Sequence, residues 1–475
     1  MAKFPLVGPS YTARSRNFDA QRSINFYPEV SESGTSKSVA ALIGTPGLRL
    51  WATLTGGNIR GCIRFSSTVS IVVCGNNVFK LFSAGNAQLI GTITPGTAPI
   101  KMASNGKVVM LVVGASGYIV SPSDNTVTGI ANPAFTGADV VDFLDGYFVF
   151  NKPGTGQFQI TGLYDTTIDP LDFATAEGSP DLLVSLIVDH RELWLFGENS
   201  TEVFFNSGNP DFPFERIQGA FIEQGCAAKF SVAKMDNSVF WLSADDRGQG
   251  MVQRAVGYQP QRISTHAVEF AIGGYSRIDD AVAYTYQQEG HSFYVLTFPS
   301  ANATWVYDAS TNMWHERAWR NPVDASLNRH RSNCQMAFAN EVLVGDWENG
   351  KIYAMDLDVF TDNGDPLPAI RQTAHLASGR FWQFFFRLWV DMETGVGLNT
   401  GQGSNPQVML QWSDDGGHNW SNELWVTAGK IGERTVRAVW RRLGRSRDRV
   451  WRVTITDPVK RVLIDGDIEM KVGTS

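Results

Sequence analysis

The sequence predicts an all-β protein: a β-propeller of about seven blades, with an extended N-terminal arm and a C-terminal β-sandwich-like module. Three observations predict this class. A hairpin-like unit recurs along the middle of the chain, glycine (46 residues) and aromatic residues (12%) are abundant, and helical periodicity is scarce. We expect the arm over residues 1–47, the propeller over 48–357 and the C-terminal module over 358–475.

The N-terminal arm is expected to be an extended strap. It contains several prolines and the polar run SESGTSKS (31–38). The apolar stretch RSINFYPEV (22–30) is expected to dock on the rest of the protein. The N-terminus lacks the apolar core of a signal peptide, so we expect a soluble protein without a secretion signal of its own.

The propeller is predicted from a unit made of a short apolar strand, a turn and an alternating strand. Its instances are VSIVVCGNNVFKLFS (69–83), KVVMLVVGASGYIVSP (107–122), VVDFLDGYFVFNKP (140–153), HRELWLFGENSTEVFFNS (190–207), NSVFWLSADDRGQGMVQRA (237–255), HSFYVLTFPSANATWVYDA (291–309) and NEVLVGDWENGKIYAMD (340–356). Their spacing of roughly 40 to 50 residues is that of four-stranded blades, although six, seven or eight blades fit it.

Each unit is interpreted as a hairpin whose turn residues tolerate a positive φ. The expected turn centres are Gly75, Gly114, Gly146, Gly197 and Gly345.

The stretch TWVYDASTNMWHERAW (304–319) indicates a hairpin similar to those of kelch-type blades. Tyr307 and Asp308 end one strand, and Trp314 is expected to pack back across the turn.

Beyond residues 357–372, which are rich in Asp, Gly and Pro, the chain stays β-like but loses the blade-length repeat. Four segments are expected to be strands of a sandwich: QFFFRLWVDMET (383–394), QVMLQWSDDGGHNWS (407–421), ERTVRAVWRRLG (433–444) and DRVWRVTIT (448–456). The apolar run FWQFFFRLWV (381–390) is about half the length of a membrane-spanning helix.

The stretch SDDGGHNWS (413–421) has the spacing S-x-D-x-G-x-x-W, which resembles the Asp box of sialidases and other propeller glycosidases. Its fixed positions are Ser413, Asp415, Gly417 and Trp420. We interpret it as a structural turn in which the carboxylate binds backbone amides, the glycine adopts a special conformation and the ring covers the hairpin. Proximity to a sugar-active site is the alternative. A sialidase-like enzyme would also need an arginine cluster for the substrate carboxylate, together with paired carboxyl groups or a Tyr–Glu pair across the scissile bond.

No other catalytic signature is present, so we expect a protein that is not an enzyme. No phosphate loop, zinc-protease motif or nucleophile elbow occurs in the chain. The four cysteines, Cys62, Cys74, Cys226 and Cys334, form no CxxC pair and are expected to be buried free thiols. No cofactor and no metal are expected.

The formal net charge of −7 argues against a surface that coats nucleic acid. One segment, residues 434–452, is nevertheless dense in arginine, and we expect it to form a single hairpin with Trp440 and Trp451 on its buried face. The candidate interface patch comprises Arg437, Arg441, Arg442, Arg445, Arg447 and Arg449. A salt-bridged solvated face, a docking surface for an acidic partner or sister subunit, and a contact for a phosphate backbone all fit this pattern.

Taken together, the chain resembles the packaged-DNA stabilisation proteins, or tail accessory factors, of short-tailed phages of the Salmonella podovirus type. The resemblance extends over essentially the whole length. It is carried by SRNFDAQRSINFYPEV (15–30), IGTPGLRLW (43–51) and the region from SDDGGHNWS to RRLGRSRDRVWRVTITDP (413–458).

This resemblance implies a late structural protein of the virion tail, assembled in the cytoplasm of the host bacterium. Such a protein forms a hexameric hub below the portal and the head-to-tail adaptor, helps retain packaged DNA until genome ejection, and supports the tail needle and tailspikes. DNA would pass through the channel without sequence-specific binding, and no membrane insertion is implied. A propeller-type glycan-binding protein or glycosidase is the alternative, and an intracellular propeller scaffold is a third.

Overall fold

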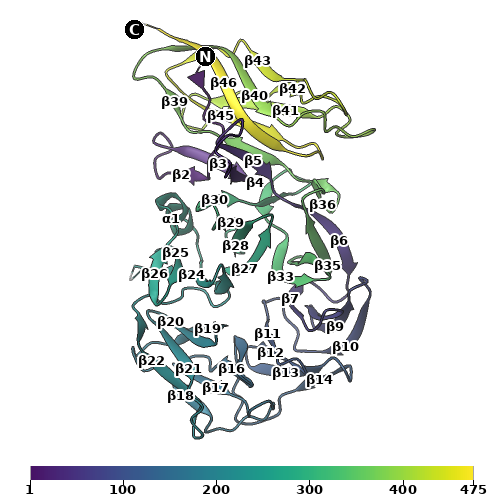
Figure 1. Cartoon of the computed structure of the whole chain (residues 1–475), viewed down its shortest axis with the longest axis vertical. Coiled ribbons are helices and arrows are strands. Elements are labelled where there is room, and N and C mark those ends of the chain that lie inside the picture. Colours follow the sequence, from purple (N-terminus) through teal and green to yellow (C-terminus); the bar gives the residue numbers. More distant parts are fainter. Residues whose placement is uncertain (1, 246, 474–475) are drawn as a thin grey trace.

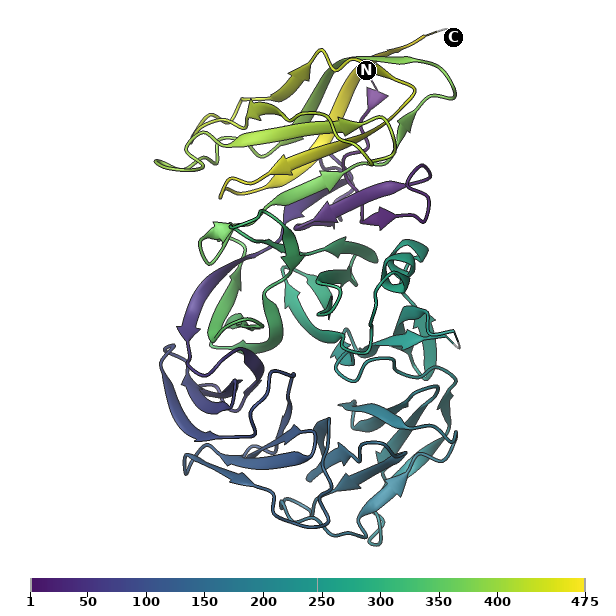
Figure 2. The ribbon, with the colours of Figure 1, turned by 180° about the vertical axis from the view of Figure 1, so that it is seen from behind.

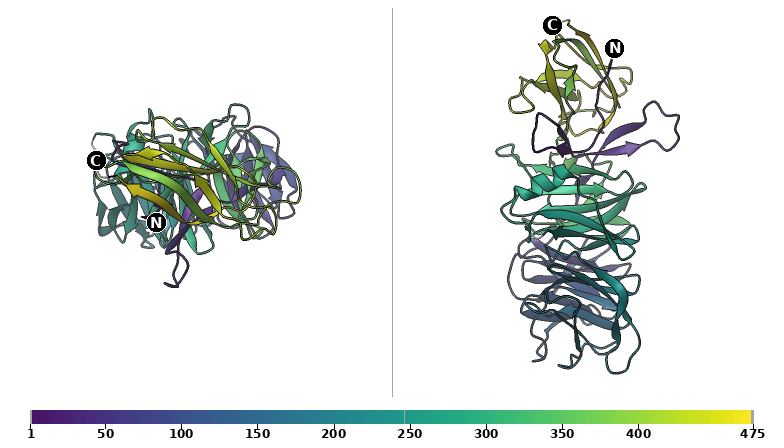
Figure 3. Two further views of the ribbon diagram at one scale, coloured as in Figure 1. Left: turned by 90° about the horizontal axis from the view of Figure 1, so that it is seen from above. Right: turned by 90° about the vertical axis from the view of Figure 1, so that its left-hand side faces the viewer.

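The computed structural model describes residues 2–245 and 247–473. A propeller and a sandwich lie one above the other along the long axis (Figures 1 and 2). The N-terminus lies on the sandwich, and the segment that follows it runs between the two modules. The right-hand view of Figure 3 shows the same stacking from the side. In the described residues, no helix is both long and apolar enough to cross a membrane.

Six blades are each built from four consecutive antiparallel strands. The first three are β7 (Ile59–Arg64), β8 (Val69–Cys74), β9 (Asn77–Phe82) and β10 (Ala87–Thr92); β11 (Lys101–Ser104), β12 (Val109–Val113), β13 (Ser116–Ser121) and β14 (Thr126–Gly129); and β15 (Val141–Leu144), β16 (Tyr147–Asn151), β17 (Gln157–Ile160) and β18 (Phe173–Thr175). The next three are β19 (Leu183–Asp189), β20 (Glu192–Gly197), β21 (Thr201–Asn206) and β22 (Phe214–Ile222); β23 (Ala233–Met235), β24 (Ser238–Ala244), β25 (Gly250–Val256) and β26 (Gln259–Arg262); and β27 (Val282–Gln288), β28 (His291–Phe298), β29 (Ala303–Asp308) and β30 (Met313–Glu316).

The ring is closed by a further four-stranded unit that combines both ends of the propeller sequence. Strands β33 (Ser332–Phe338), β34 (Glu341–Asp346) and β35 (Lys351–Asp356) pair in order, and β35 then pairs with β6 (Gly47–Thr53) from before the first blade. With this closing unit, the described part of the chain forms a ring of seven four-stranded units, in line with the expected number of about seven.

The propeller is stable only as a ring because its apolar residues are buried between neighbouring blades. Ile71 and Val73 of β8, for example, pack with Leu111 of β12 in the next blade. The closing unit packs on the first blade in the same way, through Leu343 and Val72. A blade removed from the ring would expose both of these faces.

Two predictions about local structure have different outcomes. The expected kelch-like hairpin is confirmed: Tyr307 of β29 lies opposite Trp314 of β30, and their ring centroids are 5.3 Å apart. Gly197 and Gly345, however, are strand residues and not turn centres. A Cβ atom on Gly345 would lie 2.3 Å from Ile59, so this glycine allows the closing unit to approach the first blade.

The sandwich consists of two packed sheets. One contains β4 (Phe26–Val30), β5 (Ala40–Gly44), β46 (Val462–Val472), β40 (Gln383–Met392) and β43 (Ala438–Arg441), with β1 (Ala2–Lys3) on β46 and β44 (Arg445–Ser446) on β40. The other contains β3 (Ala20–Ile24), β38 (Ala369–Gln372), β45 (Asp448–Ile455), β41 (Gln407–Ser413) and β42 (Leu424–Thr427), with β2 (Tyr11–Thr12) on β3 and β39 (Leu376–Ala377) on β45. Leu388, Trp440 and Trp451 are buried in the core between the sheets.

Five short elements complete the fold. Strands β31 (Ala318–Arg320) and β32 (Leu327–Arg329) form a hairpin, and β36 (Thr361–Asp362) pairs with β6 and with β37 (Asp365–Pro366). The one α-helix in the described residues, α1 (His266–Gly273), begins after Thr265, whose side chain caps its first turn.

The N-terminal segment joins the two modules. Strand β3 pairs in parallel with β30 of the sixth blade, at Ile24 and Glu316, and in antiparallel fashion with β38 of the sandwich. The sixth blade and one sandwich sheet are therefore a single hydrogen-bonded sheet of eleven strands. The apolar stretch 22–30 lies in β3 and β4 and is docked, as its composition predicts.

Candidate interaction surface

The Asp-box residues form a compact turn after strand β41. The Ser413 hydroxyl donates to Asp415 Oδ1 at 2.7 Å and accepts from the backbone amide of Gly417 at 2.8 Å. The same Asp415 oxygen accepts from the amides of His418 and Asn419, at 3.0 and 2.8 Å. The carboxylate is thus used within its own turn.

The ionised state of Asp415 and the backbone conformation of Gly417 both suit this turn. The amide of Asn419 and the hydroxyl of Ser413 hold the pKa of the Asp415 carboxyl below its ordinary value, because both stabilise the anion. Gly417 has a φ of 89°, a conformation that favours glycine.

Trp420 covers the turn but is only half-buried. Its indole nitrogen donates to the carbonyl of Gly417 at 3.2 Å, and the guanidinium of Arg452 lies 3.6 Å from its ring centroid. A cation–π contact at the surface therefore takes the place of full burial.

The arginine-rich segment is not a single hairpin, which corrects the sequence-based expectation. Strand β43 and strand β44 both pair with β40 in one sheet, whereas β45 pairs with β41 and β38 in the other. The chain crosses between the two sheets of the sandwich after Ser446, so the arginines before and after this point do not lie on paired strands of one hairpin. Trp440 and Trp451 do lie on the buried side, as expected.

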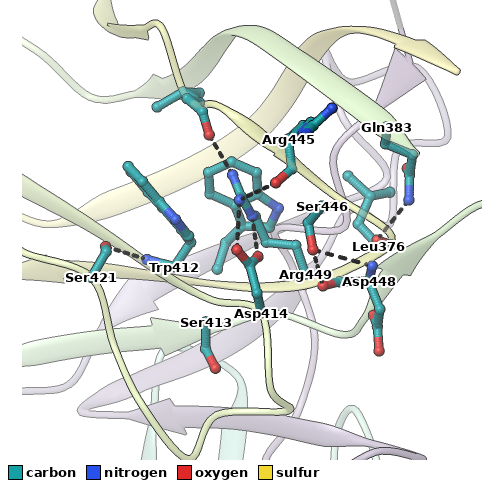
Figure 4. A network of polar contacts seen from close by, with 12 residues as sticks. Leu376, Gln383, Trp412, Ser413, Asp414, Ser421, Arg445, Ser446, Asp448 and Arg449 are labelled. Atoms are coloured by element: carbon teal, nitrogen blue, oxygen red, sulfur yellow. Dashed lines mark hydrogen bonds and ion pairs between the residues drawn. The ribbon is translucent and has the colours of Figure 1, made fainter. Parts of the chain in front are cut away.

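Arg449 belongs to the interior and not to an exposed patch. Its side chain is 2% exposed, and its guanidinium forms a two-point ion pair with Asp414, at 2.6 and 2.8 Å (Figure 4). It also lies near the rings of Phe385, Trp412 and Trp451, with centroid distances between 4.9 and 5.2 Å. Alternation along the strand did not reveal this, because the carboxylate partner is 35 positions away.

The other five predicted interface residues are exposed: Arg437, Arg441, Arg442, Arg445 and Arg447. Within the described part of the chain, none of them forms an ion pair with a carboxylate. This observation disfavours the interpretation as a salt-bridged face.

Two of these arginines lie over an aromatic ring, and a third is hydrogen-bonded to the backbone of an exposed phenylalanine; sequence reasoning assigned neither aromatic residue to the site. Arg445 and Arg447 lie 4.7 and 4.8 Å from the ring centroid of Trp382. The backbone amide of Arg442 donates to the carbonyl of Phe386, whose side chain is 46% exposed. We name this surface the arginine–aromatic patch: Arg441, Arg442, Arg445, Arg447, Trp382 and Phe386.

A β-bulge explains why Phe386 is exposed. The register between β40 and β46 shifts between Phe385 and Arg387, so Phe386 is turned away from the core that buries Phe385. The sequence signal was the run FWQFFFRLWV (381–390), in which eight of ten residues are apolar, more than the alternating pattern of a half-buried strand contains.

Like charges are held close together at the edge of the patch. Arg387 and Arg441 lie directly opposite each other on β40 and β43, an arrangement that is unfavourable unless an anion is near. Glu469 contacts Arg387 at 3.5 Å and compensates only one of the two. Exposed arginines beside the exposed Phe386 and the half-buried Trp382 are typical of protein interfaces, which are enriched in Arg and aromatic residues. Guanidinium groups also bind carboxylates by two-point contacts.

Comparisons with known proteins agree with this two-part architecture. A family model described as "Bacteriophage P22 Gp10, beta-propeller" matches residues 2–360, and one described as "Bacteriophage P22 Gp10, beta-sandwich" matches residues 369–471. No curated protein matches the chain.

Two solved structures are similar in part. The WD40 β-propeller domain of Doa1 is 8% identical with a TM-score of 0.41, over 65% of this chain and 97% of that one. The computationally designed Ika8 protein is 10% identical with a TM-score of 0.39, over 74% of this chain and 98% of that one. TM-scores this low do not establish a shared fold.

Proposed function

The chain belongs to the bacteriophage P22 Gp10 family of structural phage tail proteins, and we propose that it is the hub subunit of a short tail. In this role six copies form a ring below the portal and its adaptor, help retain the packaged DNA, and support the tail needle and tailspikes. The observation that carries the proposal is the match of both domains to the family models, over residues 2–360 and 369–471.

The fold supports a role as a rigid multi-partner platform. The propeller is closed by the pairing of β6 with β35, and strand β3 joins the sixth blade to the sandwich by backbone hydrogen bonds. Forces on the sandwich are therefore transmitted to the propeller through a continuous sheet and not through a flexible linker. Such a subunit suits a ring that must hold several partners in register.

The arginine–aromatic patch supports a docking role for the sandwich. A chain with a formal net charge of −7 offers acidic surface on every copy, so a sister subunit is a chemically suitable partner for unpaired arginines. An acidic surface on another tail protein would be recognised by the same chemistry.

Genome retention tests the proposed function directly. Phage heads assembled without this chain are expected to lose their packaged DNA, and restoring the chain should restore retention. Heads that stay full and stable in its absence contradict the proposal.

Assembly tests the contribution of the patch. Changing Arg441, Arg442 and Arg445 to Glu should abolish ring formation or attachment to the tail while the melting curve stays unchanged. The matched control changes Arg64, Lys107 and Arg247 to Glu, which alters the net charge equally at exposed positions of the propeller. Equal assembly of both variants would show that the patch is a solvated surface and not a docking site.

A further inference from the structure

Two thiols meet where the propeller ring is closed. Cys62 lies on β7, the inner strand of the first blade, and Cys334 lies on β33, the inner strand of the closing unit. Their sulfur atoms are 3.3 Å apart, although the residues are 272 positions apart in the sequence.

The surroundings bring these two strands together independently of the thiols. The side chain of Asn333 donates to the carbonyl of Ile59 at 2.9 Å, which links β33 to β7 one residue away from Cys334. Gly345, behind Cys334, lets Ile59 approach closely. The two sulfur atoms are therefore held by the closure itself.

The thiols are also reachable by a small reagent. Both side chains are half-buried and line a cavity of about 270 Å³ between the inner strands of the propeller. The other two cysteines are fully buried, and each thiol donates to a backbone carbonyl: Cys74 to Gly57, and Cys226 to Ala228.

We propose that Cys62 and Cys334 form an oxidation-dependent disulfide that fastens the propeller ring covalently across its closure. In the structure they are free thiols, as suits a chain made in a reducing cytoplasm. A virion component meets oxidants after release from the cell, and the bond would then form. The bond would enclose the first six blades in one covalent loop.

Hydrogen peroxide is small enough to enter this cavity, and it can act as the oxidant that accepts two electrons from the pair of thiols. One thiol releases its proton, and the resulting thiolate sulfur attacks a peroxide oxygen. The O–O bond breaks, a sulfenic acid forms, and the leaving hydroxide takes up the released proton to give one water. The second thiol attacks the sulfenic sulfur, and the S–O bond breaks with release of a second water. Two thiols are oxidised to one disulfide, and one peroxide is reduced to two waters. The hydrogen bond to the Cys334 thiol, and then burial, raise the pKa of Cys62, so the first step should be slow at neutral pH.

Mass spectrometry of the full chain is the direct test. After treatment with peroxide under native conditions, denaturation and alkylation, we expect two of the four thiols to be blocked and a peptide containing Cys62 linked to one containing Cys334. Recovery of both residues as alkylated thiols, as sulfinic or sulfonic acids, or linked to Cys74 or Cys226, would overturn the proposal.

The effect on the ring is tested by thermal unfolding. The oxidised chain should melt about 3–10 °C above the reduced chain, and a reducing agent should reverse the shift, because the bond restrains a long loop of the unfolded chain. The Cys334→Ser variant should show no shift, whereas Cys226→Ser should keep it. Identical melting of oxidised and reduced wild type would show that the bond does not fasten the closure. If a cysteine variant fails to fold, the peptide mapping still tests the proposal, because it uses only the wild-type chain.

Discussion

Arg449 is buried in the sandwich and forms a two-point ion pair with Asp414, the residue between Ser413 and Asp415 of the Asp-box turn. The turn and the arginine-rich segment are thus one structural unit. Asp415 holds the turn together from inside, and Asp414 projects from the same turn to neutralise a guanidinium enclosed by aromatic rings. The motif therefore has a second structural task that its spacing does not reveal.

Replacing Asp414 by Asn should lower the free energy of unfolding of the sandwich by about 1–3 kcal/mol, because it leaves the buried Arg449 without a carboxylate. In an Arg449→Met background the same change should cost little, since no buried charge remains. Denaturant unfolding of the four members of this cycle measures the difference. The exposed Asp358→Asn variant is the control, and equal losses in both backgrounds would contradict the pairing.

Trp420→Ala should destabilise the sandwich by about 1–2 kcal/mol, since the ring is half-buried and only its buried part contributes. Trp451→Ala should lower the free energy of unfolding by about 3–5 kcal/mol, because the ring of Trp451 is fully buried. Chemical denaturation of the two variants side by side tests this ranking. Equal losses would mean that Trp420 has a packing role beyond its contact with Arg452.

The contact between β4 and the sixth blade should weaken at alkaline pH. His291 binds Asp308 through Nδ1 at 2.8 Å and Glu29 through Nε2 at 2.5 Å, and these carboxylates raise its pKa to about 9. A raised histidine pKa gives stability that is fully present below about pH 6.5 and is lost as the pH rises through about 9.

Melting temperatures between pH 6 and pH 9.5 check this expectation. The wild-type value should fall more steeply over this range than that of His291→Gln. His418→Gln, at an exposed position, should retain the wild-type slope. A His291→Gln variant with an unchanged slope would assign the pH dependence to other groups.

Arg371→Met should release the N-terminal segment. The buried guanidinium of Arg371 donates to the carbonyls of Leu6, Gly8 and Pro9, at 2.6, 3.1 and 2.9 Å. Its loss leaves the carbonyls of Leu6 and Pro9 without this donor, whereas Gly8 keeps the hydroxyl of Ser23. We expect a loss of about 2–4 kcal/mol and faster hydrogen exchange and proteolysis in residues 5–24.

The geometry of this anchor provides its own comparisons. Lysine at position 371 should not restore protection, because one ammonium cannot reproduce the planar fork of a guanidinium. Gly8→Ala should have a similar effect, since its Cβ would lie 2.6 Å from Arg371. The exposed Arg380→Met variant should behave like wild type. Normal protection of residues 5–24 in Arg371→Met would contradict the anchoring role.

The sequence by itself determined those features that depend on neighbouring residues. Alternating apolar residues and turn residues defined the hairpins, and hence the all-β class, the propeller and the contact of Tyr307 with Trp314. The Asp-box bonds likewise join residues within one short stretch, from Ser413 to Trp420.

The tertiary structure decided which groups from distant parts of the chain meet. The burial of Arg449 depends on Asp414, which lies in the turn that follows a different strand, β41. The exposure of Phe386 depends on a shift of register between β40 and β46. Gly345 is needed because Ile59 approaches it, and β3 joins the two modules because its edges fit β30 and β38. Periodicity specifies which face a side chain takes, but the partner that neutralises a charge or covers a ring is fixed only when separate strands are packed together.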